Sequence, residues 1–79
     1  MSSDQIYATL TEIMQDVFDD DEIVANPELT AKDVEGWDSL SNLRFILSVE
    51  KEFGVKFTAA EIGKLANVGE LAAMIAARA

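Results

Sequence analysis

The sequence predicts an all-α fold, a four-helix bundle with three longer helices, a short third helix and a long loop between helices one and two. Apolar residues recur at helical spacing in separate stretches of the chain. A polar residue suited to capping stands before each stretch. A length of 79 residues allows one domain with a small core. We therefore expect residues 1–79 to form a single bundle.

The first predicted helix follows a cap at Ser2 or Ser3. Its apolar positions keep the spacing of one helix face. They are Ile6, Leu10, Ile13, Met14 and Val17. The acidic run Asp19–Glu22 ends the pattern.

The segment from Asp19 to Asp38 has no apolar period and is predicted to be a long loop. Scattered apolar residues are expected to pin it to the bundle. These anchors are Ile23, Val24, Leu29, Val34 and Trp37. Structureless connections of this length are unusual in a compact domain and are often functional.

The second predicted helix runs from Ser39 to about Phe53, with Asp38 as its cap and Gly54 as its stop. It carries two apolar stripes. One spans an arc of about 100°, the width of a core-facing stripe, and comprises Phe45, Ile46, Val49 and Phe53. The other spans about 60° and comprises Leu40, Leu43 and Leu47, which we call the leucine ridge.

Ser39 lies at the near edge of the leucine ridge, and Arg44 and Lys51 lie along it. Two interpretations are open. Aligned exposed leucines mark a contact surface for another protein. Alternatively, the ridge packs under the long loop, beneath Trp37.

Two shorter helices are predicted after the extended link Val55–Phe57. Thr58 and Glu61 form a capping box for a third helix through Leu65, and Asn67–Glu70 repeats this logic for a fourth. The apolar side of the fourth helix is Val68, Leu71 and Ile75. Its alanines indicate either close helix packing or room for a guest chain in the core, and they are Ala72, Ala73, Ala76 and Ala77.

The composition argues against several classes of function. Fifteen acidic and six basic residues give a net charge of −9, which disfavours nucleic acid and anionic membranes and favours basic partners. The chain has no histidine and no cysteine, so unaided catalysis and the usual zinc sites are not expected. No apolar run reaches the length of a membrane span. We therefore expect a cytoplasmic protein.

The dense acidic run Asp19–Glu22 is the one candidate for a cation site. It lacks the alternating ligand spacing and the turn glycine of a calcium loop. We expect no metal site there.

Three segments resemble acyl carrier proteins, the phosphopantetheine-bearing domains of fatty acid, polyketide and nonribosomal peptide assembly. They are Asp38-Ser39-Leu40, the helix end Glu50–Gly54 with the following Val55–Phe57, and the last helix start Asn67–Leu71. The resemblance covers nearly the whole chain. Triplet, spacing, acidity and helix pattern together carry it.

The resemblance implies that Ser39 carries 4′-phosphopantetheine, transferred from coenzyme A by a phosphopantetheinyl transferase that uses magnesium. The thiol of this arm would hold acyl groups as thioesters. Asp38 would be both helix cap and part of the surface that the transferase recognises. The chain would then be a monomeric carrier and not an enzyme.

The leucine ridge, with Arg44 and Lys51 beside it, would by the same resemblance dock partner enzymes. These would be an acyl-loading ligase or transferase and a ketosynthase or another biosynthetic enzyme. Carriers of bacterial fatty acid synthesis typically have an acidic second helix, whereas Ser41 and Arg44 follow the serine here and Lys51 interrupts the acidic stretch. This departure suggests a free-standing, specialised carrier.

Two other classes share the predicted fold. A peptidyl or aryl carrier of nonribosomal synthesis usually has Gly-Gly before its serine, where this chain has Trp37-Asp38. An unmodified interaction module would use the leucine ridge alone, with Ser39 serving only as a helix cap. Failure to accept phosphopantetheine would identify it.

We predict that added salt or magnesium raises the thermal midpoint of unfolding, because repulsion among the many carboxylates favours expansion. The measurement is a thermal melt in low and moderate salt. A midpoint that does not change between the two conditions would refute this.

Overall fold

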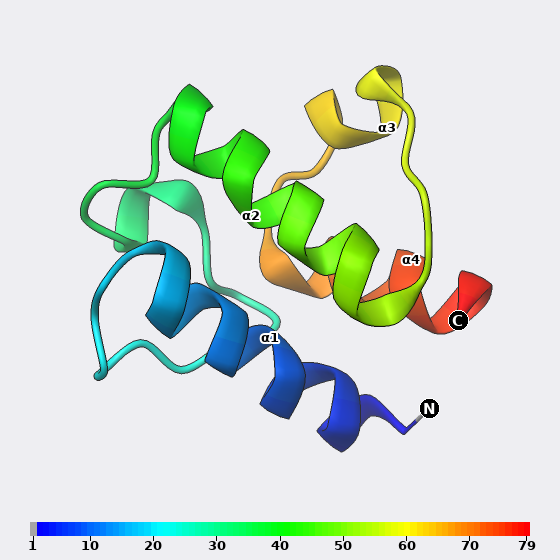
Figure 1. Cartoon of the computed structure of the whole chain (residues 1–79), viewed down its shortest axis with the longest axis horizontal. Coiled ribbons are helices and arrows are strands. Elements are labelled where there is room, and N and C mark those ends of the chain that lie inside the picture. The colour runs from blue at the N-terminus through cyan, green and yellow to red at the C-terminus, as the bar shows by residue number, and fades with distance from the viewer. Residues whose placement is uncertain (1) are drawn as a thin grey trace.

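The computed structural model describes residues 2–79, and within them the regular elements are all helical. Their bounds are α1 Ser3–Val17, the 3-10 helix η1 Ala31–Asp33, α2 Ser39–Phe53, α3 Ala59–Gly63 and α4 Val68–Arg78. In Figure 1, α2 crosses the molecule next to α1, with α4 behind its far end and the short α3 at the edge. The predicted all-α fold with a short third helix is confirmed.

Polar side chains cap the helices at the predicted positions. Ser2, and not Ser3, caps α1, because its hydroxyl accepts a hydrogen bond from the Gln5 amide at 3.3 Å. The Gln5 side chain accepts in return from the Ser2 amide at 3.0 Å. Thr58 and Glu61 make the same reciprocal pair at α3. These bonds satisfy amides that the first helical turn leaves without partners.

The core lies between α1, α2 and α4, with anchors from the connection. Its fully buried side chains are Ile6, Leu10, Met14, Phe45, Ile46, Val49, Val68 and Ile75. The predicted core stripe of α2 is therefore buried, with Phe53 half-buried against it. In α4 only Ala72 of the four alanines is buried. Close packing of the α4 alanines is therefore seen at Ala72 alone.

The connection between α1 and α2 contains the short helix η1, which the sequence pattern did not predict. Ile23 and Val34 are buried anchors, as predicted, and Ala25 is a further one. Val24 was predicted to be an anchor but is 64% exposed. Its neighbours Ile23 and Ala25 both face inward, and side chains alternate in an extended segment, so Val24 faces solvent.

Two carbonyl groups of this connection bind the start of α4. The amide of Val68 donates to the Leu29 carbonyl at 2.9 Å, and the amide of Gly69 donates to the Pro27 carbonyl at 3.1 Å. A Cβ at position 69 would lie only 2.8 Å from the Pro27 oxygen, so the approach requires glycine. Backbone groups, and not only apolar anchors, therefore hold the connection.

The helix α3 ends at Gly63, two residues before the predicted Leu65. Arg78 at the end of α4 ties it to the bundle. The guanidinium forms a salt bridge with Glu61, donates to the Lys56 carbonyl at 2.8 Å, and lies 5.4 Å from the centre of the Phe57 ring. A helix of five residues is too short to be stable alone, so these contacts hold it in place.

Hydrogen bonds to the Glu61 carboxylate lower its pKa from 4.5 to about 2. The bond from Arg78 has the largest effect, and the bond from the Thr58 amide has the next largest. A carboxyl whose pKa falls on folding stabilises the protein fully above its unfolded pKa and loses this effect as pH falls through the folded pKa. We therefore predict that Glu61→Gln, which keeps the capping box, lowers the thermal midpoint at pH 6. The gap to wild type should close between pH 4.5 and 2.

Thermal melts of both proteins across this pH range measure the effect. It should be small and weaken in salt, because the pair is exposed. A gap that stays constant down to pH 2 would contradict the assigned ion pair.

Candidate functional site

Asp38 fixes the start of α2. Its Oδ1 accepts a hydrogen bond from the Ser41 amide at 2.9 Å, as the prediction of a cap requires. The Ser41 hydroxyl lies 2.9 Å from the same oxygen and 2.6 Å from the Gly36 carbonyl. A hydroxyl has one proton, so it donates to one of these acceptors at a time. Hydrogen bonds to its carboxylate lower the pKa of Asp38. The bond from the Ser41 amide has the largest effect, and the bond from the Ser41 hydroxyl has the next largest.

Trp37 anchors the backbone just before the site. Its ring is half-buried and meets Phe45 edge-on, with centroids 5.5 Å apart and an angle of 81° between the planes. Phe18 packs on it with a centroid distance of 5.3 Å. The indole Nε1 donates to Asn42 Oδ1 at 3.0 Å. Apolar packing and one directed bond therefore hold the chain as it enters α2.

Ser39 is exposed and is the first residue of α2. Within residues 2–79 its hydroxyl makes no hydrogen bond, whereas the hydroxyl of Ser41 is engaged. The site fits a phosphate ester on the Ser39 oxygen, because the start of a helix carries positive partial charge and stabilises an anion. Of these two serines, Ser39 is the one free for modification.

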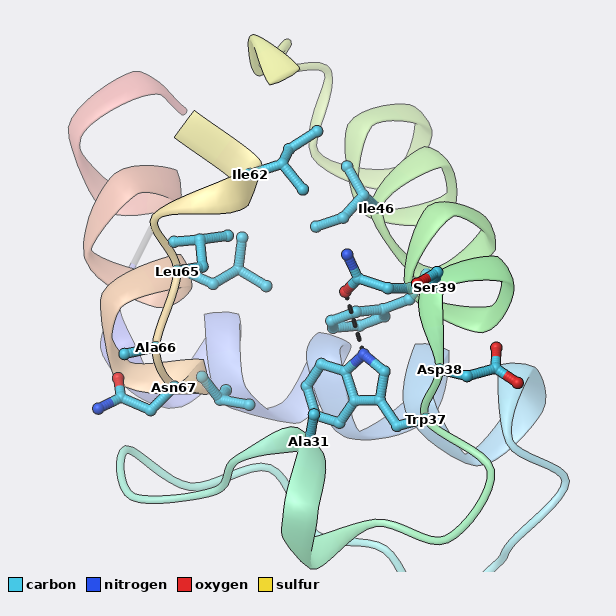
Figure 2. Close-up of a pocket in the computed structure, with 13 residues that line it drawn as sticks. Ala31, Trp37, Asp38, Ser39, Ile46, Ile62, Leu65, Ala66 and Asn67 are labelled. Carbon is cyan, nitrogen blue, oxygen red and sulfur yellow. Dashed lines mark hydrogen bonds between the residues drawn. The ribbon is translucent and has the colours of Figure 1, made fainter. Parts of the chain in front are cut away.

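A pocket of about 390 Å³ opens beside Ser39, between α2, α3 and the start of α4. Figure 2 shows Ile46 on one side, Ile62 and Leu65 on the other, and Trp37 and Ala31 below. Most of its wall is apolar, made by Phe45, Ile46, Ile62, Leu65, Val68 and Leu71. Asp38 also lines the pocket, but its carboxylate points away from Ile62 and Leu65. An attached group at Ser39 therefore has an apolar cavity within reach.

The leucine ridge is exposed on the outer side of α2. Leu40, Leu43 and Leu47 are 70%, 53% and 55% exposed. Arg44 and Lys51 are exposed as well. The alternative in which the ridge packs beneath the loop and Trp37 is therefore wrong, because Trp37 packs inward on Phe18 and Phe45.

Within the part of the chain that the structure describes, the acidic run Asp19–Glu22 belongs to no cluster of three or more potential metal ligands. Among residues 2–79, no group of three or more acidic side chains converges in a way that could hold a metal ion. Asp20 uses its carboxylate locally and accepts from the Glu22 amide at 3.0 Å. In the same described range, no helix has the length and apolar character needed to cross a membrane.

Comparison with known proteins decides what kind of chain this is. The family model for a phosphopantetheine attachment site matches residues 8–75. The solution structure of a holo acyl carrier protein from Geobacter metallireducens superposes with a TM-score of 0.86 and 42% identity, covering 92% of this chain and 84% of that chain. The chain belongs to the acyl carrier protein family. No curated protein matches it in sequence.

Membership establishes a carrier with covalently attached 4′-phosphopantetheine, as the sequence predicted. Carriers of this family act with biosynthetic enzymes and with the transferase that modifies them. The similarity to a holo acyl carrier protein favours this class over a peptidyl or aryl carrier, and the match to a phosphopantetheine attachment site favours it over an unmodified interaction module.

The sequence predicted the functional residues at the start of α2 but not the pocket beside them. Asp38 and Ser39 lie together at the helix start, and the leucine ridge follows them along α2. Asn42, Ile62 and Leu65 were not singled out, although all three line the pocket. One signal was available for Asn42, because it follows Ser39 by three residues and so lies near it on the helix.

We predict that Asp38→Ala lowers the thermal midpoint by a few degrees, because the Ser41 amide loses its cap. Asp38→Asn should preserve the midpoint, because asparagine also caps. Its pH dependence should differ from wild type: a carboxyl of lowered pKa stabilises fully above its unfolded pKa, and this effect fades as pH falls through the folded pKa. Equal midpoints for alanine and asparagine variants would contradict the cap.

Proposed function

We propose that Ser39 carries the 4′-phosphopantetheine arm of this acyl carrier protein, and that the arm holds acyl groups as thioesters for fatty acid, polyketide or related biosynthesis. One observation carries this assignment. Ser39 presents an exposed hydroxyl without a hydrogen-bond partner among the described residues, at the start of α2 and at the edge of an apolar pocket. Ser41, two residues away, has its hydroxyl engaged.

The attachment forms a bond between the Ser39 oxygen and the phosphorus of the phosphopantetheine. The bond from this phosphorus to the nucleotide part of coenzyme A breaks, and the nucleotide leaves with its phosphates. The serine proton passes to the transferase. Asp38 contributes to the surface that the transferase recognises, since its carboxylate projects from the start of α2.

The carrier is the substrate of other enzymes and not itself an enzyme. The chain has neither histidine nor cysteine, so the thiol of the arm supplies the reactive sulfur that the protein lacks. We place it in the cytoplasm as a monomer, which agrees with a chain that needs no disulfide.

The leucine ridge, with Arg44 and Lys51, is the proposed docking surface for the acyl-loading ligase or transferase and for a ketosynthase or another biosynthetic enzyme. Exposed, aligned leucines supply apolar contact area. Two cations beside them repel a strongly basic enzyme patch. We therefore propose a specialised carrier with dedicated partners of weaker positive charge.

We predict that a broad-specificity phosphopantetheinyl transferase, with coenzyme A and magnesium, adds one phosphopantetheine to the unmodified protein. Intact mass measures the addition. Ser39→Ala should remain unmodified, because the accepting oxygen is gone. Ser41→Ala is the matched control, since it removes the neighbouring hydroxyl, and it should still be modified.

Fragmentation of the tryptic peptide 33–44, which contains both serines, places the added mass directly. Mass on Ser41, or modification of Ser39→Ala, would overturn the assignment of Ser39. No addition with several transferases would overturn the carrier function proposed for it.

We predict that Arg44→Glu increases transfer between this carrier and a ketosynthase system of general fatty acid synthesis, because it removes one like charge from the docking surface. The initial transfer rate should rise and the gain should shrink in high salt. Lys56→Glu is the matched control: it makes the same change in charge beyond the far end of α2 and should have a smaller effect. An unchanged or lower rate for Arg44→Glu would contradict the proposal.

A further inference from the structure

The side chain of Asn42 gives the pocket beside Ser39 a polar group with a fixed direction. Asn42 is half-buried on α2 and lines the pocket. Its side-chain amide forms a hydrogen bond with the indole Nε1 of Trp37, at a distance of 3.0 Å. The indole N–H can only donate, so the amide atom that it meets must be the oxygen. The Nδ2 group, with its two protons, is therefore turned away from the indole.

This Nδ2 group makes no hydrogen bond within residues 2–79, as the bonds of Asn42 show. Three backbone donors at the start of α4 already have partners. The Val68 and Gly69 amides donate to the connection, and the Glu70 amide donates to the side chain of Asn67. Figure 2 shows Asn67 at the outer edge of the pocket, opposite Ser39.

We propose that the Asn42 Nδ2 group donates a hydrogen bond to a carbonyl oxygen of whatever occupies this pocket. This rests on the proposed attachment at Ser39. An apolar occupant would displace water from Nδ2 and leave an amide donor unpaired, which is unfavourable. A carbonyl oxygen placed there restores the bond. The pocket thus discriminates between occupants by one acceptor atom as well as by apolar volume.

Two parts of a loaded carrier offer such an oxygen. Ser39 and Asn42 are three residues apart in the helix, a rise of about 4.5 Å, so an amide carbonyl of the arm is within reach of Asn42. An acyl chain that folds into the pocket supplies a carbonyl of its own when it is a 3-oxoacyl group. A saturated acyl chain has no carbonyl group other than that of its thioester.

The test compares four forms of the protein: unmodified, with the arm alone, with an octanoyl chain, and with a 3-oxooctanoyl chain, both chains joined through a hydrolysis-stable amide. Intact mass first verifies that each load is present. The side-chain amide resonances of Asn42 then report on Nδ2. The thermal midpoint reports on how firmly the chain occupies the pocket.

The variant for this test is Asn42→Asp, which has the same shape and keeps an oxygen for the Trp37 bond but has no donor. It should fold like wild type, which the single tryptophan reports by its fluorescence. In wild type, the 3-oxo chain should raise the midpoint above that with the saturated chain. One net hydrogen bond corresponds to about fivefold higher occupancy of the pocket. In Asn42→Asp this difference should disappear.

The outcomes separate the two sources of the carbonyl. A downfield shift of the Nδ2 protons with the 3-oxo chain only supports the cargo as the acceptor. A shift already present with the arm alone supports the arm amide. Nδ2 resonances that do not change in any loaded form overturn the inference and leave the carrier function intact, because the mass shows the load. If no load can be attached to Ser39, the inference about Asn42 and the proposed carrier function both fail.

Discussion

The start of α2 is the constraint on which the other functional features depend. Trp37 packs inward on Phe45 and Phe18, while Asp38 closes the first turn through the Ser41 amide. These two neighbours point in opposite directions, one into the core and one into solvent. Because both are fixed, Ser39 is exposed at the helix start. The same geometry sets the leucine ridge outward and turns Asn42 toward the pocket.

The pocket depends on segments that are held by few interactions. Its outer wall is α3 with the link to α4, and Arg78 secures α3 through Glu61 and the Lys56 carbonyl. The lower wall depends on the connection between α1 and α2, which reaches α4 through backbone bonds. Apolar burial is concentrated in α1, α2 and α4. The rigid part of the molecule therefore holds Ser39, and the lightly held part borders the space beside it.

Sequence patterns predicted the elements well where local chemistry decides them. Caps are local, so the sequence predicted Asp38, Thr58 and Asn67 directly and narrowed the first cap to Ser2 or Ser3, of which Ser2 is the cap. The exposure of Val24 could not be predicted, because tertiary contacts decide which side of an extended segment faces inward. The end of α3 could not be predicted either, because tertiary contacts also decide where a five-residue helix stops. The pocket and the bond between Trp37 and Asn42 were beyond prediction for the same reason, since they join side chains from different elements or turns.

The most direct test of this account is a comparison of backbone amide chemical shifts in the unmodified and phosphopantetheine-bearing forms. If the start of α2 presents Ser39 for attachment, the changes should centre on residues 36–42 and decline along α2, with the far ends of α1 and α4 unaffected. Additional changes in α3 would indicate that the arm reaches the pocket. Changes centred on another segment, with residues 36–42 unaffected, would contradict the assignment of Ser39.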